Sequence, residues 1–165
     1  MDTGYQGGFD MEEMTLLLVD DEERFLSTTK KLLNKKGIQA LTAISGEKAL
    51  EVLETHTVHV VILDVKMPGM DGNATLREIK RRFPLVEVIM LTGHATVESA
   101  VDGLKAGAID YLMKPADLGE LIEKAGEAFA KRQRIEEKIR VARIRTAMKS
   151  PRQILAESEK QGEIE

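Results

Sequence analysis

The chain of 165 residues carries a net charge of −4, 42% hydrophobic residues, 4% aromatic residues and no cysteine. This length fits one ordinary domain with some extra chain, and the hydrophobic content argues against wholesale disorder. The missing cysteine excludes disulfides, thiolate metal sites and cysteine nucleophiles, and the mild charge gives no general reason to expect nucleic acid or membrane binding. No apolar run approaches the roughly 18 residues of a membrane span, and the first eight residues do not resemble a signal peptide, so we expect a cytoplasmic protein without membrane contact.

A Gly-rich, acidic segment, residues 1–13, opens the chain, and we expect it to be a flexible leader. From Met14 onward, strand and helix patterns alternate five times. The expected strands are 16–19, 38–43, 58–63, 86–91 and 108–113, and the expected helices are 23–35, 47–55, 74–83, 96–106 and one that begins near 117. Ser45 is the expected N-cap of the second helix. This alternation predicts an α/β fold, a doubly wound parallel sheet whose strands are joined by right-handed crossovers.

The last helix is expected to extend to about Lys149, well beyond the fifth strand–helix unit. Its second part is basic, with eight Lys or Arg against two Glu between 131 and 149. Pro151 discourages further helix, so we expect residues 152–165 to form a frayed acidic tail. The predicted division is therefore a leader 1–13, a domain 14–128, and a helical basic extension with its tail over 129–165.

The basic helix has three interpretations, which the sequence leaves open. It is a solvated helix without a role, a short coiled coil with a second copy of the chain, or a contact for nucleic acid or an acidic partner. The heptad pattern is weak, and aromatic residues for base stacking are absent from this stretch. Nucleic acid is therefore a partner that we do not favour.

Charged residues directly follow three of the apolar strands. Asp20 and Asp21 follow the first, Asp64 follows the third, and Lys114 follows the fifth. Taken singly, each has an ordinary interpretation as a turn, a cap or a solvated charge. The carboxyl ends of parallel strands meet at one edge, however, and ligands bind at that edge. The common polarity therefore predicts one pocket with three carboxylates and an ammonium.

Such a cluster of acids needs a cation. Two carboxylates 4 Å apart repel by ~4 kcal/mol at an effective dielectric near 20. Mg²⁺ is the natural partner, because it prefers hard oxygen ligands and accepts phosphate oxygens. One of the carboxylates can then attack phosphorus to give an aspartyl phosphate, while the metal and Lys114 neutralise charge. Thr92, at the end of the fourth strand, can donate to a phosphoryl oxygen.

At these positions, and over the segment Asp-Val-Lys-Met-Pro-Gly-Met-Asp-Gly at 64–72, the chain resembles the CheY-like receiver domain of two-component response regulators. The segments 91–96 and 106–111 look most like receivers of enhancer-binding (NtrC-like) transcription activators. The resemblance covers residues 14–128 and implies a flavodoxin-like sheet with strand order 2-1-3-4-5. About 36 residues follow Phe129, too few for an output domain with its own core, so we expect a stand-alone receiver or the front of a longer protein.

The resemblance also implies residue roles. Asp64 would be the phosphorylation site, receiving the group from a sensor histidine kinase. Asp20 and Asp21 would bind Mg²⁺ together with Asp64 and the Lys66 carbonyl. Thr92 and Lys114 would contact the phosphoryl oxygens, and the bond from Lys114 to the following proline would be cis.

A switch is implied as well. A phosphoryl group on Asp64 would draw Thr92 inward and let Tyr111 fill the vacated space, which would remodel the face formed by the fourth helix, fifth strand and fifth helix. We expect a homodimer through this face or through the C-terminal helix, and an unknown downstream protein target. Lys66 and His94 flank the pocket, either tuning water attack on the phosphoryl group or lying exposed without a role.

Two rival functions are weaker. A hydrolase of the aspartyl-phosphate type usually has a second acid two residues after its nucleophile, and here Lys66 holds that position. A DNA-binding regulator would have to use the basic helix alone. We therefore predict a signalling receiver that catalyses only its own phosphorylation and dephosphorylation, not a turnover enzyme.

Overall fold

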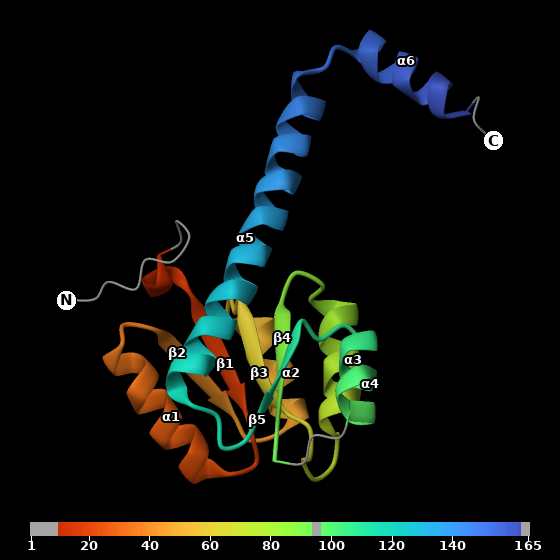
Figure 1. Ribbon diagram of the computed structural model, residues 1–165. Coiled ribbons are helices and arrows are strands. Elements are labelled where there is room, and N and C mark those ends of the chain that lie inside the picture. Colours follow the sequence, from red (N-terminus) through yellow and green to blue (C-terminus); the bar gives the residue numbers. More distant parts are fainter. Residues whose placement is uncertain (1–9, 94–96, 163–165) are drawn as a thin grey trace. The chain divides into compact units, whose positions relative to one another are not determined.

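Five parallel strands form one sheet in the order β2-β1-β3-β4-β5 (Figure 1). The computed structural model describes residues 10–93 and 97–162, in one unit that ends at Arg132 and a second that begins at Gln133. The strands are β1 (Thr15–Val19), β2 (Gln39–Ala43), β3 (Val60–Asp64), β4 (Glu87–Thr92) and β5 (Asp110–Met113). The predicted flavodoxin-like strand order and α/β class are confirmed.

The helices alternate with these strands. They are η1 (Met11–Glu13), α1 (Glu23–Lys35), α2 (Gly46–Thr55), α3 (Gly72–Arg82), α4 (Val97–Lys105), α5 (Leu118–Met148) and α6 (Pro151–Gly162). From β1 to α5 the predicted boundaries agree with these to within two residues; the expected start of the fourth helix at Thr96 lies outside the described residues. The Ser45 cap is confirmed, since its hydroxyl accepts the Lys48 backbone N–H at 3.2 Å.

The central strands are buried on both faces, which explains their unbroken apolar runs. Alternate residues of each strand enter separate core clusters: Leu16 and Leu18 face the side of α1 and α5, and Leu17 and Val19 face the side of α2 and α3. Because successive side chains of a strand point to opposite faces, both layers of helices pack on one sheet. All five strands are parallel, so their carboxyl ends form a common edge of the sheet.

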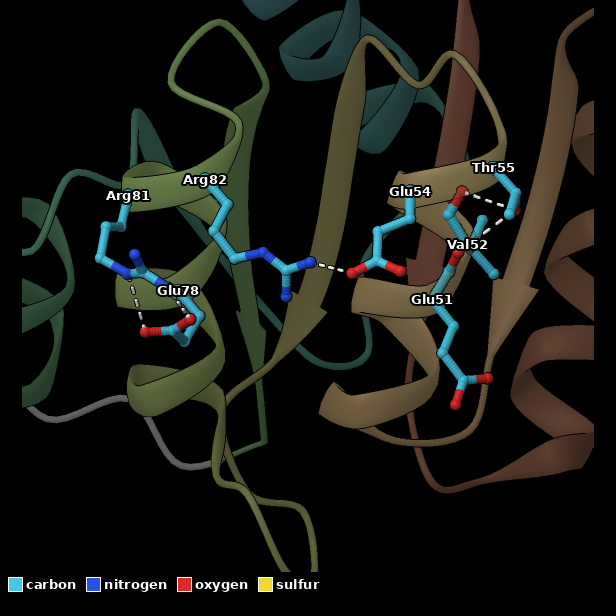
Figure 2. A network of polar contacts seen from close by, with 7 residues as sticks. All are labelled: Glu51, Val52, Glu54, Thr55, Glu78, Arg81 and Arg82. Atoms are coloured by element: carbon cyan, nitrogen blue, oxygen red, sulfur yellow. Dashed lines mark hydrogen bonds and ion pairs between the residues drawn. The ribbon is translucent and has the colours of Figure 1, made fainter.

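On the solvent side, α2 and α3 carry the polar contacts of Figure 2. Arg82 of α3 forms an ion pair with Glu54 of α2, and Arg81 pairs with Glu78 one turn earlier at 2.9 Å. Exposed pairs of this kind contribute little to stability, because solvent screens them. The helices are therefore held mainly by their apolar faces.

Two predictions about the ends of the chain are corrected. Within the expected leader, residues 11–13 form η1, which Asp10 caps by accepting the Glu12 N–H at 2.9 Å, and Met11 packs against the core. Residues 1–9 lie outside the described part.

The second correction is α6, which occupies the stretch expected to be frayed up to residue 162. Ser150 and Gln153 form a reciprocal capping box, with the Ser150 N–H donating to the Gln153 side chain at 3.0 Å and the Gln153 N–H to the Ser150 hydroxyl at 3.4 Å. Pro151 occupies the first helical position, where proline is favoured. The proline therefore ends α5 and begins α6.

Candidate functional site

The strand ends place the predicted polar residues at one edge of the sheet. Asp64 is the last residue of β3 and pairs in register with Leu91 of β4, and Thr92 ends β4. The Lys114 backbone N–H, just beyond β5, donates to the Thr92 carbonyl at 2.7 Å. Asp20 follows β1, which neighbours β3. Residues that are far apart in sequence are therefore neighbours in space.

Three carboxylates converge there. Asp20, Asp21 and Asp64 each offer an oxygen, and these oxygens lie within 4.8 Å of one another. Asp20 is fully buried and Asp64 is 6% exposed, whereas Asp21 is open to solvent. At 4.8 Å, two such charges repel by ~3.5 kcal/mol at an effective dielectric near 20. A positive charge is therefore required to hold the cluster ionised.

Lys114 supplies one positive charge. Its ammonium donates to Asp20 Oδ2 and lies 3.8 Å from Asp64 Oδ2 and 3.8 Å from Glu22 Oε1. Backbone N–H groups hold the other oxygens: that of Glu22 donates to Asp20 Oδ1 at 2.9 Å, and that of Lys66 to Asp64 Oδ1 at 3.3 Å. The two buried carboxylates are thereby fixed in orientation.

Burial and neighbouring charges shift the pKa values of both Asp64 and Lys114. Burial raises the pKa of the Asp64 carboxyl and the Asp20 charge raises it further, against the opposing effects of the Lys114 ammonium and the Lys66 N–H. Burial lowers the pKa of Lys114, but its hydrogen bond to Asp20 and the charges of Asp20 and Asp64 outweigh burial, so this pKa lies above its usual value. Lys114 is therefore charged at neutral pH.

The donor set fits a hard divalent cation. The three carboxylates form the group of acids that can hold a metal within the described part of the chain, and the exposed position of Asp21 leaves room for coordinated water. Mg²⁺ takes one or two carboxylates directly and keeps several waters, so two of the three acids suffice as direct ligands and the third is available through a coordinated water. A metal role for the Lys66 carbonyl stays a prediction.

The expected switch residues lie on neighbouring strands. Thr92 is 1% exposed at the end of β4. Tyr111 is half-buried on β5, in register with Met90, and packs against the core on the side of α2 and α3. Their movement stays a prediction.

The three histidines and the proline bond after Lys114 complete the surroundings of the strand ends. His94 lies outside the described residues. His59 precedes β3, at the opposite edge of the sheet, where its Nδ1 accepts the Thr15 N–H at 3.0 Å, and His56 is exposed nearby. The peptide bond between Lys114 and Pro115 is cis, as the resemblance implies.

Sequence reasoning missed two neighbours of Lys114. Glu22 approaches its ammonium as described above, and the Phe25 ring lies beneath it, with Nζ 4.7 Å from the ring centroid. Phe25 is one of the apolar residues at helical spacing in α1, and this spacing by itself predicts only a place in the core. Its place in the first turn of α1, which begins two residues after Asp21, is the signal that could have found it.

A family model and several known proteins match this chain in sequence. The family model for the response regulator receiver domain covers residues 16–126. The DNA-binding transcriptional regulator NtrC of Klebsiella pneumoniae is 37% identical over 113 residues, which are 68% of this chain and 24% of that protein. The transcriptional regulatory protein ZraR of Escherichia coli (strain K12) is 40% identical over 117 residues, 69% of this chain and 26% of that protein. The chain thus spans about a quarter of the length of these curated relatives.

Solved structures agree. A CheY-like receiver domain protein from Methanospirillum hungatei JF-1 superposes with a TM-score of 0.70 at 31% identity, covering 73% of this chain and 97% of that one. NtrX from Brucella abortus, solved with ADP, gives 0.70 at 32% identity, with coverage of 74% and 28%. Among the described residues, no helix has both the length and the apolar character needed to cross a membrane. The chain belongs to the response regulator receiver domain family of two-component signalling.

Proposed function

We propose that this receiver accepts a phosphoryl group on Asp64 from the phosphohistidine of a sensor histidine kinase, in a Mg²⁺-dependent reaction. The observation that carries the proposal is the position of the Asp64 carboxylate, which is buried between two acids and the Lys114 ammonium. The reaction forms a bond between an Asp64 oxygen and phosphorus and breaks the bond from phosphorus to the leaving nitrogen of the kinase.

The surroundings of the three acids distinguish Asp64 as the nucleophile. Both oxygens of Asp20 are engaged at close range, by the Lys114 ammonium and the Glu22 N–H. Asp21 is exposed, so solvent would compete with a phosphoryl donor. Asp64 Oδ1 accepts the Lys66 N–H, and its Oδ2 lies beyond hydrogen-bond distance of Lys114. Oδ2 is therefore the oxygen that we assign to the attack.

When bound, Mg²⁺ would neutralise the charge that develops on the phosphoryl oxygens. Asp20 and Asp21 would hold it together with Asp64. Lys114 would turn from Asp20 toward a phosphoryl oxygen, and the Thr92 hydroxyl would donate to another. The residues of the chain thus position the reacting groups and balance charge, and water later removes the phosphoryl group slowly.

The signal would leave through the face formed by α4, β5 and the first part of α5. Thr92 and Tyr111 connect this face to the pocket, because β4 and β5 are paired and Lys114 is bonded to the Thr92 carbonyl. Val101, Leu104 and Met113 are 40%, 48% and 56% exposed there. Their exposure supports a partner or a second copy at this face, and the C-terminal helix is the alternative route to a homodimer.

Intact mass after incubation with acetyl phosphate and Mg²⁺ tests the proposal. We expect a gain of about 80 daltons, one phosphoryl group, that EDTA abolishes. Asp64→Ala removes the gain, and Asp102→Ala, at an exposed acid of α4, retains it. A mass gain that persists in Asp64→Ala would show that the acceptor is a residue other than Asp64. Steady turnover of a generic phosphate ester would instead favour the hydrolase.

A further inference from the structure

The Lys114 ammonium lies over an aromatic ring that the proposed chemistry does not use. Its Nζ is 4.7 Å from the Phe25 ring centroid, within the roughly 6 Å range of an attractive cation–π contact. Phe25 is half-buried on α1 and packs against the core on the side of α1 and α5. The Lys114 side chain is 18% exposed, so little water competes for its charge. The contact therefore connects the first turn of α1 to the pocket.

We propose that Phe25 is a positioning residue for phosphoryl transfer, whose ring face holds the Lys114 ammonium inside the acidic pocket. The inference rests on the proposed function, because there Lys114 neutralises phosphoryl oxygens. The contact of the ring with the pocket is made to the Lys114 ammonium, so the ring would act through the lysine.

The hydrogen bonds of Lys114 leave its position underdetermined. An ammonium has three N–H donors, and one of them is used by Asp20. Asp64 and Glu22, each at 3.8 Å, attract the charge but are too far to fix its direction. A lysine side chain has many rotamers, and the ring restricts those in which the ammonium leaves the pocket. Phe25 thus supplies the constraint that the acids lack.

A ring face also suits a lysine that exchanges partners. The attraction between a cation and the ring quadrupole does not require a particular N–H to point at the ring. When Lys114 turns from Asp20 toward a phosphoryl oxygen on Asp64, the ring continues to hold the ammonium. An aliphatic side chain at this position would fill the same space without attracting the charge.

The test measures the rate at which acetyl phosphate phosphorylates the chain at saturating Mg²⁺, here called the rate of labelling. For Phe25→Leu we expect about a fivefold slower rate, equivalent to ~1 kcal/mol. Fluorinated phenylalanines at position 25 keep the ring shape while withdrawing charge from its face, so the rate should fall stepwise with each added fluorine. Phe25→Tyr should retain most of the wild-type rate.

Phe83→Leu is the matched control. Phe83 is also half-buried and has a cation, the Arg82 guanidinium, 5.4 Å from its ring centroid, but it lies just before β4, at the opposite edge of the sheet. Its substitution should leave the rate unchanged. A slow Phe25→Leu combined with a flat fluorine series would show that the ring only packs, and the proposal would be wrong.

A second measurement separates this inference from the proposed function. In the unphosphorylated full chain with ¹³C-labelled lysine, the ring current of Phe25 should shift the Lys114 Hε resonances. Phe25→Leu should return them to the position of the exposed lysines. Unshifted resonances in the wild type would overturn the inference even where phosphorylation of Asp64 succeeds. Shifted resonances without phosphorylation would overturn the proposed phosphoryl transfer and, with it, the positioning role of Phe25, leaving only the contact between ring and ammonium.

Discussion

Replacing Lys114 with methionine tests the charge balance of the pocket directly. At 3.8 Å the ammonium attracts the Asp64 carboxylate by ~4 kcal/mol at an effective dielectric near 20, and its closer contact with Asp20 adds at least as much. The desolvation of three charges offsets much of this attraction. Removing one partner of a buried pair typically costs about 3–5 kcal/mol. Because Lys114 is 18% exposed, we expect Lys114→Met to lose about 3 kcal/mol, the lower end.

The assay is urea unfolding of the full chain, followed by circular dichroism, in EDTA and then in saturating Mg²⁺. In EDTA the free energy of unfolding should fall as stated, and in Mg²⁺ the gap to wild type should narrow, because the metal replaces the missing charge. Lys124→Met is the control: Lys124 pairs with Asp110 at 2.9 Å near the surface, and its loss should cost no more than about 1 kcal/mol. Equal stability of Lys114→Met and wild type in EDTA would refute the reasoning.

Three further predictions concern the same edge of the sheet. Burial raises the pKa of Asp64 and the Asp20 charge raises it further, so the ionised form of Asp64 destabilises the fold. Asp64→Asn should therefore increase the free energy of unfolding at pH values above the raised pKa. This gain should be lost as the pH falls toward 3.8, the usual pKa of the carboxyl. Urea titrations across pH check the sign, and a gain that grows on acidification would contradict it. A Cβ at Gly72 would lie 2.4 Å from the Asp64 carbonyl oxygen, so Gly72→Ala should lower the free energy of unfolding by at least ~2 kcal/mol and slow phosphorylation. Gly103→Ala is the control: its Cβ would lie 3.5 Å from the Met90 side chain, an ordinary contact, and neither quantity should change. Glu47 accepts the Met70 N–H at 3.3 Å, so Glu47→Ala should speed hydrogen exchange at Met70; unchanged exchange would show that this contact does not hold the loop.

The location of the pocket was predictable because a local pattern carries long-range information. Asp64 ends an apolar run, and Lys114 follows another. In a parallel sheet every such end lies at the same edge, so their proximity follows without any knowledge of the turns between them. The alternation of strands and helices makes each connection a crossover, so the strands run parallel. The position of Asp20 follows in the same way.

Phe25 and α6 show where this reasoning stops. Periodicity assigns Phe25 to the buried face of α1, but it does not give the side-chain direction that brings the ring under a lysine 89 positions later. For the segment that forms α6, the acidic composition and the missing apolar periodicity predict loose chain. Every described residue of α6 is exposed, so this helix requires no apolar stripe. The Ser150–Gln153 capping box is readable in the sequence, and Pro151, which discourages continuation of α5, also favours the first position of α6.

The charges of the pocket also determine the order of events in the proposed reaction. Asp20, Asp21 and Asp64 against one ammonium leave a formal charge of −2, without counting the solvent-exposed Glu22, and this charge repels a phosphoryl donor that is itself an anion. A divalent cation would bring the sum to zero, so the metal must bind before the donor can approach. Converting the Asp64 carboxylate to an aspartyl phosphate dianion then adds one negative charge. This added charge attracts the Lys114 ammonium from Asp20 toward the phosphoryl group. Labelling should therefore be negligible in EDTA at any donor concentration, and a rate without metal that rises to the Mg²⁺ value at high donor would contradict this order.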